Sequence, residues 1–150
     1  MDCCNSDSLY HIFSHIIRLH YHRAHTLLDG IGIYPGQPPM LIVLYKKNGQ
    51  SQKELADKLN IKPATVTVML NRMEKAELVE RRQDTDDQRV SRVYLTQKGR
   101  ESYKKVIEVI RTMESECFNN FTEEEKALLR KLLMQMRNNL LKVCDDKPDF

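Results

Sequence analysis

The sequence predicts a mainly α-helical domain that carries one short β-hairpin. Three observations point to this fold class: apolar residues recur at helical spacing over most of the 150 residues, clusters of glycine and proline separate these segments, and β-prone residues gather in residues 78–96. Hydrophobic residues make up 41% of the chain, enough to bury a core.

No apolar run approaches the roughly 20 residues that a membrane-spanning helix needs. The start of the chain, "MDCCNSDSLYHIF", carries acidic residues where a signal peptide carries basic ones. We therefore expect a single cytoplasmic domain, residues 1–150, without a membrane segment.

The first expected helix is long and amphipathic and runs from Ser8 to Leu28, where Ile12, Ile16 and Leu19 recur at helical spacing. Glycines and prolines in residues 30–36 then break the chain. The next stretch, "QPPMLIVLYKKNG", indicates a second helix, short and largely buried, that ends at a glycine.

Residues 51–76 carry the signals of a helix-turn-helix. Ser51 and Glu54 form a capping box that begins a third helix, because each side chain satisfies a free backbone N–H of the other residue. Asn60 suits a left-handed turn, and Pro63 suits the first position of a fourth helix over residues 63–77. Two short helices separated by about four residues are typical of this motif.

The segments "LVERR" and "RVYLT" are short and β-prone, and they predict a hairpin over residues 78–96 with a charged loop between its strands. Two further helices follow, over residues 97–121 and 122–144. The second has another capping box, formed by Thr122 and Glu125.

The charge distribution indicates a polyanionic partner. Residues 46–105 hold 15 Lys+Arg against 9 Asp+Glu, a net charge of +6, whereas the rest of the chain has a net charge of −3. A basic middle segment between mildly acidic arms favours binding of nucleic acid.

The fourth helix has two distinct faces. Val66, Met69, Leu70 and Met73 share one face and are expected to pack on the third helix. The other face combines small, hydrogen-bonding and cationic residues, which suits insertion into a DNA major groove, because Thr and Ala contact thymine methyl groups and Asn or Arg contact base edges. The alternative is a solvated face on an ordinary helical pair.

The loop "RRQDTDDQRVSR" mixes arginines with aspartates. A hairpin loop reaches a neighbouring minor groove, and Arg89 near its tip is the residue type which that groove attracts. In an extended segment Asp87 would lie beside Arg89 and aim its guanidinium, while Asp84 and Asp86 would pair with Arg81, Arg82 or Arg92. A calcium loop is the rival interpretation, but counting from Asp84 places Arg89 where glycine is needed and Leu95 where glutamate is needed.

The segment "DTDDQRVSRVYLTQKGR" resembles the wing of the MarR family of bacterial regulators, whose pattern is roughly D-P-x-D-x-R, an alternating strand and L-T-x-x-G. The preceding "LADKLNIKPATVTVMLNRMEKAELVERR" is similar to the helix-turn-helix of that family. The resemblance implies a winged helix-turn-helix lobe, residues 37–96 with the wing at 78–96, flanked by dimerisation helices at 5–36 and 97–144. It also implies a homodimer on a pseudo-palindromic double-stranded DNA operator, with a cleft for a small aromatic or phenolic effector.

The chain departs from the family pattern in two places. Val68 stands where many members carry a basic residue, which puts a guanine contact there in doubt, and Thr85 replaces the usual proline of the wing. The residues expected to contact DNA are Ser51, Lys62, Ala64, Thr65, Thr67, Val68, Asn71, Arg72, Lys75, Arg82, Asp87 and Arg89.

Histidines and cysteines near the N-terminus raise two further hypotheses. His11 and His15 have the i, i+4 spacing of metal ligands. They form a stripe with His22 and His25 that lies opposite the apolar arc of the helix, so we expect a solvated face or the rim of an interface, and no metal. Some relatives sense oxidants through a cysteine near the N-terminus, which makes Cys3 and Cys4 redox candidates. The sequence has none of the glycine loops or nucleophile motifs of enzymes and implies no cofactor.

The sequence therefore predicts a homodimeric DNA-binding transcriptional regulator, with repression as the expected output and release by a small ligand or oxidant. The alternative from another class is a winged-helix protein-interaction module without DNA affinity.

Overall fold

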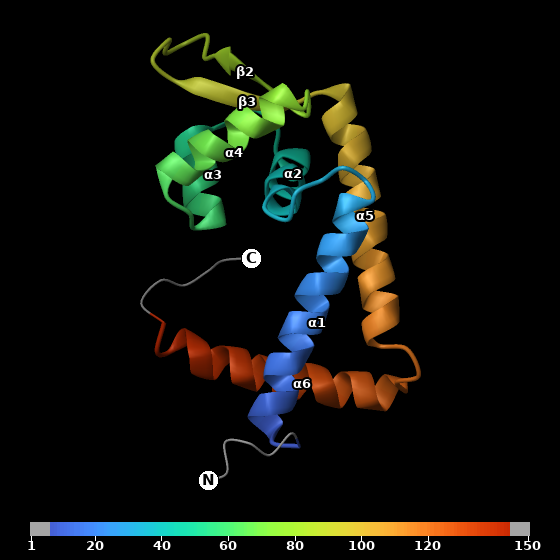
Figure 1. The fold of residues 1–150 in the computed structure, drawn as a ribbon. Coiled ribbons are helices and arrows are strands. Elements are labelled where there is room, and N and C mark those ends of the chain that lie inside the picture. The colour runs from blue at the N-terminus through green and yellow to red at the C-terminus, as the bar shows by residue number, and fades with distance from the viewer. Residues whose placement is uncertain (1–6, 145–150) are drawn as a thin grey trace.

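The computed structural model describes residues 7–144 (Figure 1). Its elements are α1 (Leu9–Asp29), α2 (Gln37–Lys46), β1 (Gln50–Ser51), α3 (Gln52–Leu59), α4 (Pro63–Lys75), β2 (Val79–Gln83), β3 (Ser91–Leu95), α5 (Gln97–Cys117) and α6 (Glu123–Leu141). Elements α2 to β3 form a lobe at one end of the molecule, and α1 and α5 extend from it side by side (Figure 1). The predicted fold class, a winged helix-turn-helix flanked by terminal helices, is confirmed.

Local capping signals set the helix starts as the sequence predicts. Ser8 caps α1 by accepting a hydrogen bond from the N–H of His11. Both predicted capping boxes are present, at Ser51 and at Thr122. Helix α2 begins with prolines in its first turn, where a missing N–H costs no hydrogen bond.

The turn of the helix-turn-helix forms at Asn60, which adopts the left-handed conformation with φ of 46°. Helix α4 then starts at Pro63, as predicted, but ends at Lys75 instead of residue 77. It ends early because Glu77 has φ of 60°, and the N–H groups of Glu77 and Leu78 donate back to the carbonyls of Glu74 and Met73. This turn directs the chain into β2.

The sheet has three antiparallel strands in the order β1-β3-β2, one more than the predicted hairpin. Arg81 of β2 lies opposite Val93 of β3, and the two-residue β1 pairs with the other edge of β3. The N–H of Gly49 donates to the carbonyl of Val93, and the Asn48 side chain accepts from Leu95 N–H. A strand of two residues has no periodicity of its own, so no sequence pattern indicates it.

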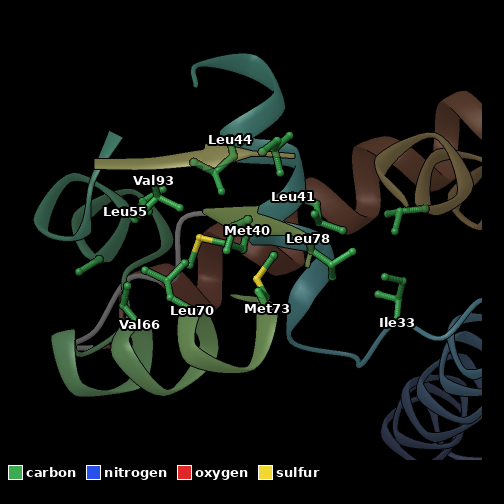
Figure 2. Close-up of a cluster of buried hydrophobic side chains, with 14 of the residues drawn as sticks. Ile33, Met40, Leu41, Leu44, Leu55, Val66, Leu70, Met73, Leu78 and Val93 are labelled. Atoms are coloured by element: carbon green, nitrogen blue, oxygen red, sulfur yellow. The ribbon is translucent and has the colours of Figure 1, made fainter. Parts of the chain in front are cut away.

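The core lies between α2, α3, α4 and the sheet. Met40, Leu41 and Leu44 of α2 are fully buried, and Leu70 and Met73 of α4 point toward Met40 (Figure 2). Of the predicted inner face of α4, Val66, Leu70 and Met73 are completely buried, whereas Met69 lies at the edge of the core. Each fully buried side chain of this size stabilises the fold by about 1.5–3 kcal/mol.

The terminal helices expose much apolar surface. Helix α5 ends at Cys117 and α6 at Leu141, both earlier than predicted, and Asn120 between them has a positive φ of 66°. Within the described residues, α6 has no buried side chain. Large hydrophobic residues at least 40% exposed on α1, α5 and α6 are Leu9, Tyr10, Ile12, Ile16, Ile17, Leu19, Tyr21, Ile110, Leu128, Leu132, Leu133, Met134 and Leu140.

The first turn of α5 is packed tightly against the turn that precedes β2. A Cβ atom added to Gly99 would lie 2.0 Å from the carbonyl oxygen of Leu78. The Thr96 hydroxyl, which caps α5, donates to the carbonyl of Glu77 at 2.6 Å. This contact fixes the angle at which α5 leaves the lobe.

The variant Gly99→Ala is expected to destabilise the protein by about 2 kcal/mol or more, because a backbone carbonyl cannot move aside as a flexible side chain can. Thermal unfolding followed by circular dichroism should show the midpoint lowered by roughly 5 °C. Gly30→Ala is the matched control, because its added Cβ would lie 3.4 Å from the nearest atom. Equal midpoints for the two variants would contradict the packing described here.

Candidate nucleic-acid interface

The outer face of α4 is free of core contacts. It lies opposite Val66, Leu70 and Met73, and all its predicted members are exposed: Ala64, Thr65, Thr67, Val68, Asn71, Arg72 and Lys75. Val68 is notable because 52% of this apolar residue is exposed. Lys62, the residue preceding α4, is also exposed. The face thus combines methyl groups, an amide and cations on one convex surface.

Two hydroxyl groups in the predicted set have intramolecular partners. The Ser51 oxygen accepts from the N–H of Glu54 as the cap of α3. The Thr67 hydroxyl donates to the carbonyl of Pro63 at 3.1 Å and accepts from the Gln52 amide at 3.4 Å. Thr67 therefore offers mainly its methyl group outward. Gln52 joins α3 to α4 here, and the sequence did not reveal that role.

Arg81 connects β2 to the outer face of α4. Its Nη2 donates to Oδ1 of Asn71 at 2.6 Å and forms an ion pair with Glu74. The hydrogen bond from Arg81 lowers the pKa of Glu74. Of the three arginines that the sequence offered as partners for the loop aspartates, Arg81 is not the one used, because α4 presents Glu74 and Asn71 on the side that faces β2.

The tip of the wing holds the predicted pair of Asp87 and Arg89. Oδ1 of Asp87 accepts from Nε of Arg89 at 3.0 Å, and Oδ2 accepts from Nη2 at 3.1 Å. The Arg89 side chain is 89% exposed, and its hydrogen bonds lower the pKa of Asp87. The pairing is confirmed, but the segment is a turn and not extended, because the N–H of Val90 donates to the carbonyl of Asp87.

The base of the wing is held by Asp84, whose carboxylate accepts from the N–H groups of Asp86 at 2.8 Å and Asp87 at 3.0 Å. It also pairs with Arg92, as one of the sequence alternatives expected. Arg92 in turn donates to the carbonyl of Gly49 at 3.1 Å, so the wing is joined to the start of β1. The Arg92 hydrogen bond, followed by the two backbone N–H groups, lowers the pKa of Asp84 to about 2.

The other predicted wing residues have different surroundings. Arg82 pairs with Glu80 on its own strand, and its guanidinium carbon lies 4.8 Å from the centre of the Tyr94 ring. Arg82, another of the three alternatives, therefore does not pair with a loop aspartate. Asp86 has no ion pair with another described residue.

Tyr34 is a residue of this surface that the sequence analysis missed. It is 68% exposed and lines a hollow of about 130 Å³ with Thr65, Val68 and Arg72 of α4. Its phenol adds a hydrogen-bonding group beside the helix. Tyr34 lies in an aperiodic loop, so no sequence spacing connects it to α4.

The histidine candidates lie away from this surface. His11, His15, His22 and His25 are exposed on α1, and residues 7–144 contain no cluster of three or more His, Cys, Asp or Glu suited to a metal. Cys3 and Cys4 lie outside the described residues, whereas Cys117 and Cys144 are exposed free thiols. Over the same part of the chain, no helix has the length and apolar character to cross a membrane.

Comparisons with known proteins agree with this geometry. The model of the MarR family matches residues 33–91. An uncharacterised HTH-type transcriptional regulator of Bacillus subtilis, YsmB, is 32% identical over 126 residues, which cover 84% of this chain and 86% of the relative. The chain belongs to the MarR family.

Two other MarR-type proteins extend the comparison. The HTH-type transcriptional repressor MdtR of Bacillus subtilis is 31% identical, over 63% of this chain and 61% of its own length. The crystal structure of the S. aureus MepR–DNA complex has the same fold, with a TM-score of 0.75 at 24% identity over 88% of this chain and 98% of the other. This MarR-family chain is thus a transcriptional regulator, and its family consists of regulators and not of enzymes.

The ion pair at the base of the wing predicts a pH dependence. Because folding lowers the pKa of Asp84 from 3.8 to about 2, its stabilising effect is complete above pH 3.8 and is lost as the pH falls toward 2. Asp84→Asn should flatten the decline in urea-unfolding midpoint between about pH 4 and pH 2. Asp86→Asn, the control, should retain the decline of the parent, and a decline in Asp84→Asn as steep as that of the parent would refute the assignment.

Proposed function

We propose that this MarR-family regulator is a homodimeric repressor that binds a pseudo-palindromic operator in double-stranded DNA. In each protomer α4 enters a major groove, and the wing reaches the adjacent minor groove. The observation that carries the proposal is the combination of an exposed α4 face outside the core with an arginine that is exposed at the wing tip and held by two hydrogen bonds to Asp87.

The residues of α4 match the chemistry of a major groove. Ala64 and Val68 offer methyl groups to thymine methyls, and Asn71 and Arg72 offer hydrogen-bond donors to base edges. The N-terminus of the helix favours a phosphate. Lys62 and Lys75 lie near its two ends and add phosphate contacts there. Ser51 and Arg82 flank this surface and complete the proposed interface with Thr65 and Thr67.

The terminal helices supply the dimer in this proposal. The exposed apolar residues of α1 and α6 form more hydrophobic surface than a monomer in water normally leaves uncovered. A two-fold dimer would place two recognition helices on half-sites about one helical turn, roughly 34 Å, apart. Occlusion of a promoter by such a complex represses transcription, and the relative MdtR is named a repressor.

An apolar groove supports release by a small ligand. It has a volume of about 320 Å³ and lies between α1, α2 and α5, where Leu28, Pro38, Val106, Val109 and Met113 line it. Its location beside the lobe matches the cleft expected for a small aromatic or phenolic effector in the cytoplasm. Oxidation of Cys3 or Cys4 is the alternative signal.

A mobility-shift titration on random-sequence duplex DNA at low salt tests the function. The parent should bind, and its affinity should fall steeply as salt rises, because each phosphate contact releases counterions. Absence of binding at low salt would overturn the proposal and favour a protein-interaction module.

The wing pair gives a sharper prediction. Arg89→Ala should weaken binding to many sequences alike and reduce the magnitude of the salt slope by about one unit, because one cationic contact is lost. Asp87→Ala should also weaken binding, because the guanidinium loses both hydrogen bonds that orient it. The opposing electrostatic gain is small, since the loop tip is screened by salt.

The double variant Arg89→Ala/Asp87→Ala separates the two roles. If Asp87 acts by orienting Arg89, the double variant should bind no more weakly than Arg89→Ala alone. A gain in affinity from Asp87→Ala, or additive losses, would show that the acid is not part of the binding surface.

The dimer is tested by sedimentation at micromolar concentration, where the parent should show twice the 17.6 kDa chain mass. Leu128→Glu/Leu132→Glu places two charges on the exposed apolar face of α6 and should yield monomers or unfolded chains. Arg130→Glu changes the charge at an exposed position on the opposite side of the same helix and should leave the dimer intact. A folded, monomeric parent would disprove the assembly.

A further inference from the structure

The contact between Arg81 and Asn71 joins the wing to the recognition helix. Nη2 of Arg81 donates to Oδ1 of Asn71 at 2.6 Å and pairs with Glu74, one turn further along α4. Asn71 is exposed, whereas the side chains of Arg81 and Glu74 are only 26% and 32% exposed. A side chain on the proposed DNA-facing surface is therefore tied to a partly buried ion pair.

The guanidinium is fixed by its surroundings. Arg81 lies in the paired region of β2, opposite Val93, so its backbone is held by the sheet. Glu74 lies on the partly buried side of α4 and holds the guanidinium from the helix side. Arg81 therefore has less freedom to turn away from Asn71 than an unpaired surface arginine.

The chemistry of the two groups determines how the amide is turned. A guanidinium has only donors, so Asn71 must direct its carbonyl oxygen at Arg81. Its Nδ2, on the other branch of the planar amide, then directs two N–H donors away from Arg81. The usual contact of asparagine with adenine requires both atoms of the amide, because the oxygen accepts from N6 while the nitrogen donates to N7. In this structure the oxygen is turned toward Arg81, which occupies one of its two lone pairs, so it is poorly placed to accept from adenine N6 as well.

We propose that Arg81 is a positioning residue for base specificity: it holds Asn71 as a pure hydrogen-bond donor, which selects the acceptor edge of guanine or thymine over the adenine edge. Guanine presents N7 and O6, and thymine presents O4, in the major groove. The inference rests on the proposed DNA-binding function and assigns a chemical preference to one residue of that surface.

Selection of bound duplexes from a randomised DNA library tests the proposal in the full chain. The parent should show one position with guanine or thymine whose preference disappears in Asn71→Ala. In Arg81→Met, which keeps an aliphatic side chain but removes every donor, the amide is free, and preference at that position should shift toward adenine by roughly tenfold. The double variant Asn71→Ala/Arg81→Met should show no preference there.

Arg82→Met is the matched control, because Arg82 is the next residue on the same strand and pairs with Glu80 and not with α4. It should weaken binding to all sequences alike and leave the preference of the Asn71-dependent position unchanged. In the free protein, the side-chain amide signal of Asn71 in a nitrogen–proton NMR spectrum should move in Arg81→Met and stay in place in Arg82→Met.

A second variant retains Arg81, so it tests the idea even where Arg81→Met fails to fold. Asn71→Asp keeps the acceptor for Arg81 but directs an oxygen outward in place of the donors, and preference should change to cytosine, whose N4 is a donor. An adenine preference in the parent, or an unaltered preference in Arg81→Met and Asn71→Asp, would overturn this inference but leave the proposed DNA-binding function standing. Absence of any DNA binding by the parent would instead overturn the proposed function and this inference with it.

Discussion

The burial of one face of α4 is the constraint on which the rest of the structure depends. Val66, Leu70 and Met73 have no exposed surface and pack toward α2 and the sheet (Figure 2). Rotation of the helix about its axis would bring these side chains into water at a cost of about 1.5–3 kcal/mol each. The direction in which the outer face points is therefore set by the core, and the contact with Arg81 adds only the orientation of the Asn71 amide.

In the wing, residues 78–96, each arginine has an acidic partner. The pairs are Arg81 with Glu74, Arg82 with Glu80, Arg89 with Asp87, and Arg92 with Asp84. Exposed ion pairs add little stability, typically 0–1 kcal/mol. Their main effect is on conformational entropy, because a long side chain that is already held in one orientation loses less freedom when it meets a partner. The acids reduce the positive charge of the wing but order its cations.

Local signals in the sequence predicted most of the fold. The capping boxes at Ser51 and Thr122, the turn at Asn60 and the start at Pro63 were all confirmed, because each depends on residues within one turn of the chain. The outer face of α4 followed from periodicity. The predicted DNA contacts themselves remain predictions.

Features that depend on neighbours distant in the sequence could not be predicted. The strand β1 exists only because β3 offers it a free edge, and Arg81 finds Asn71 only through the packing of α4 on β2. Tyr34 lies beside α4 for the same reason. The sequence predicts extended chain at Asp87 where the structure has a turn, because an Asp-x-Arg spacing allows the same ion pair in both conformations.

The exposure of α6 makes the amount of proposed dimer depend steeply on the concentration of the chain. Its described residues bury no side chain within the protomer, so much of its stabilisation in the proposed homodimer comes from the second chain. Formation of such a species is second order in chain concentration. While monomers predominate, halving the total chain concentration lowers the dimer concentration about fourfold. A small change in synthesis or dilution by cell growth would then produce a disproportionate change in occupied operator, without any ligand.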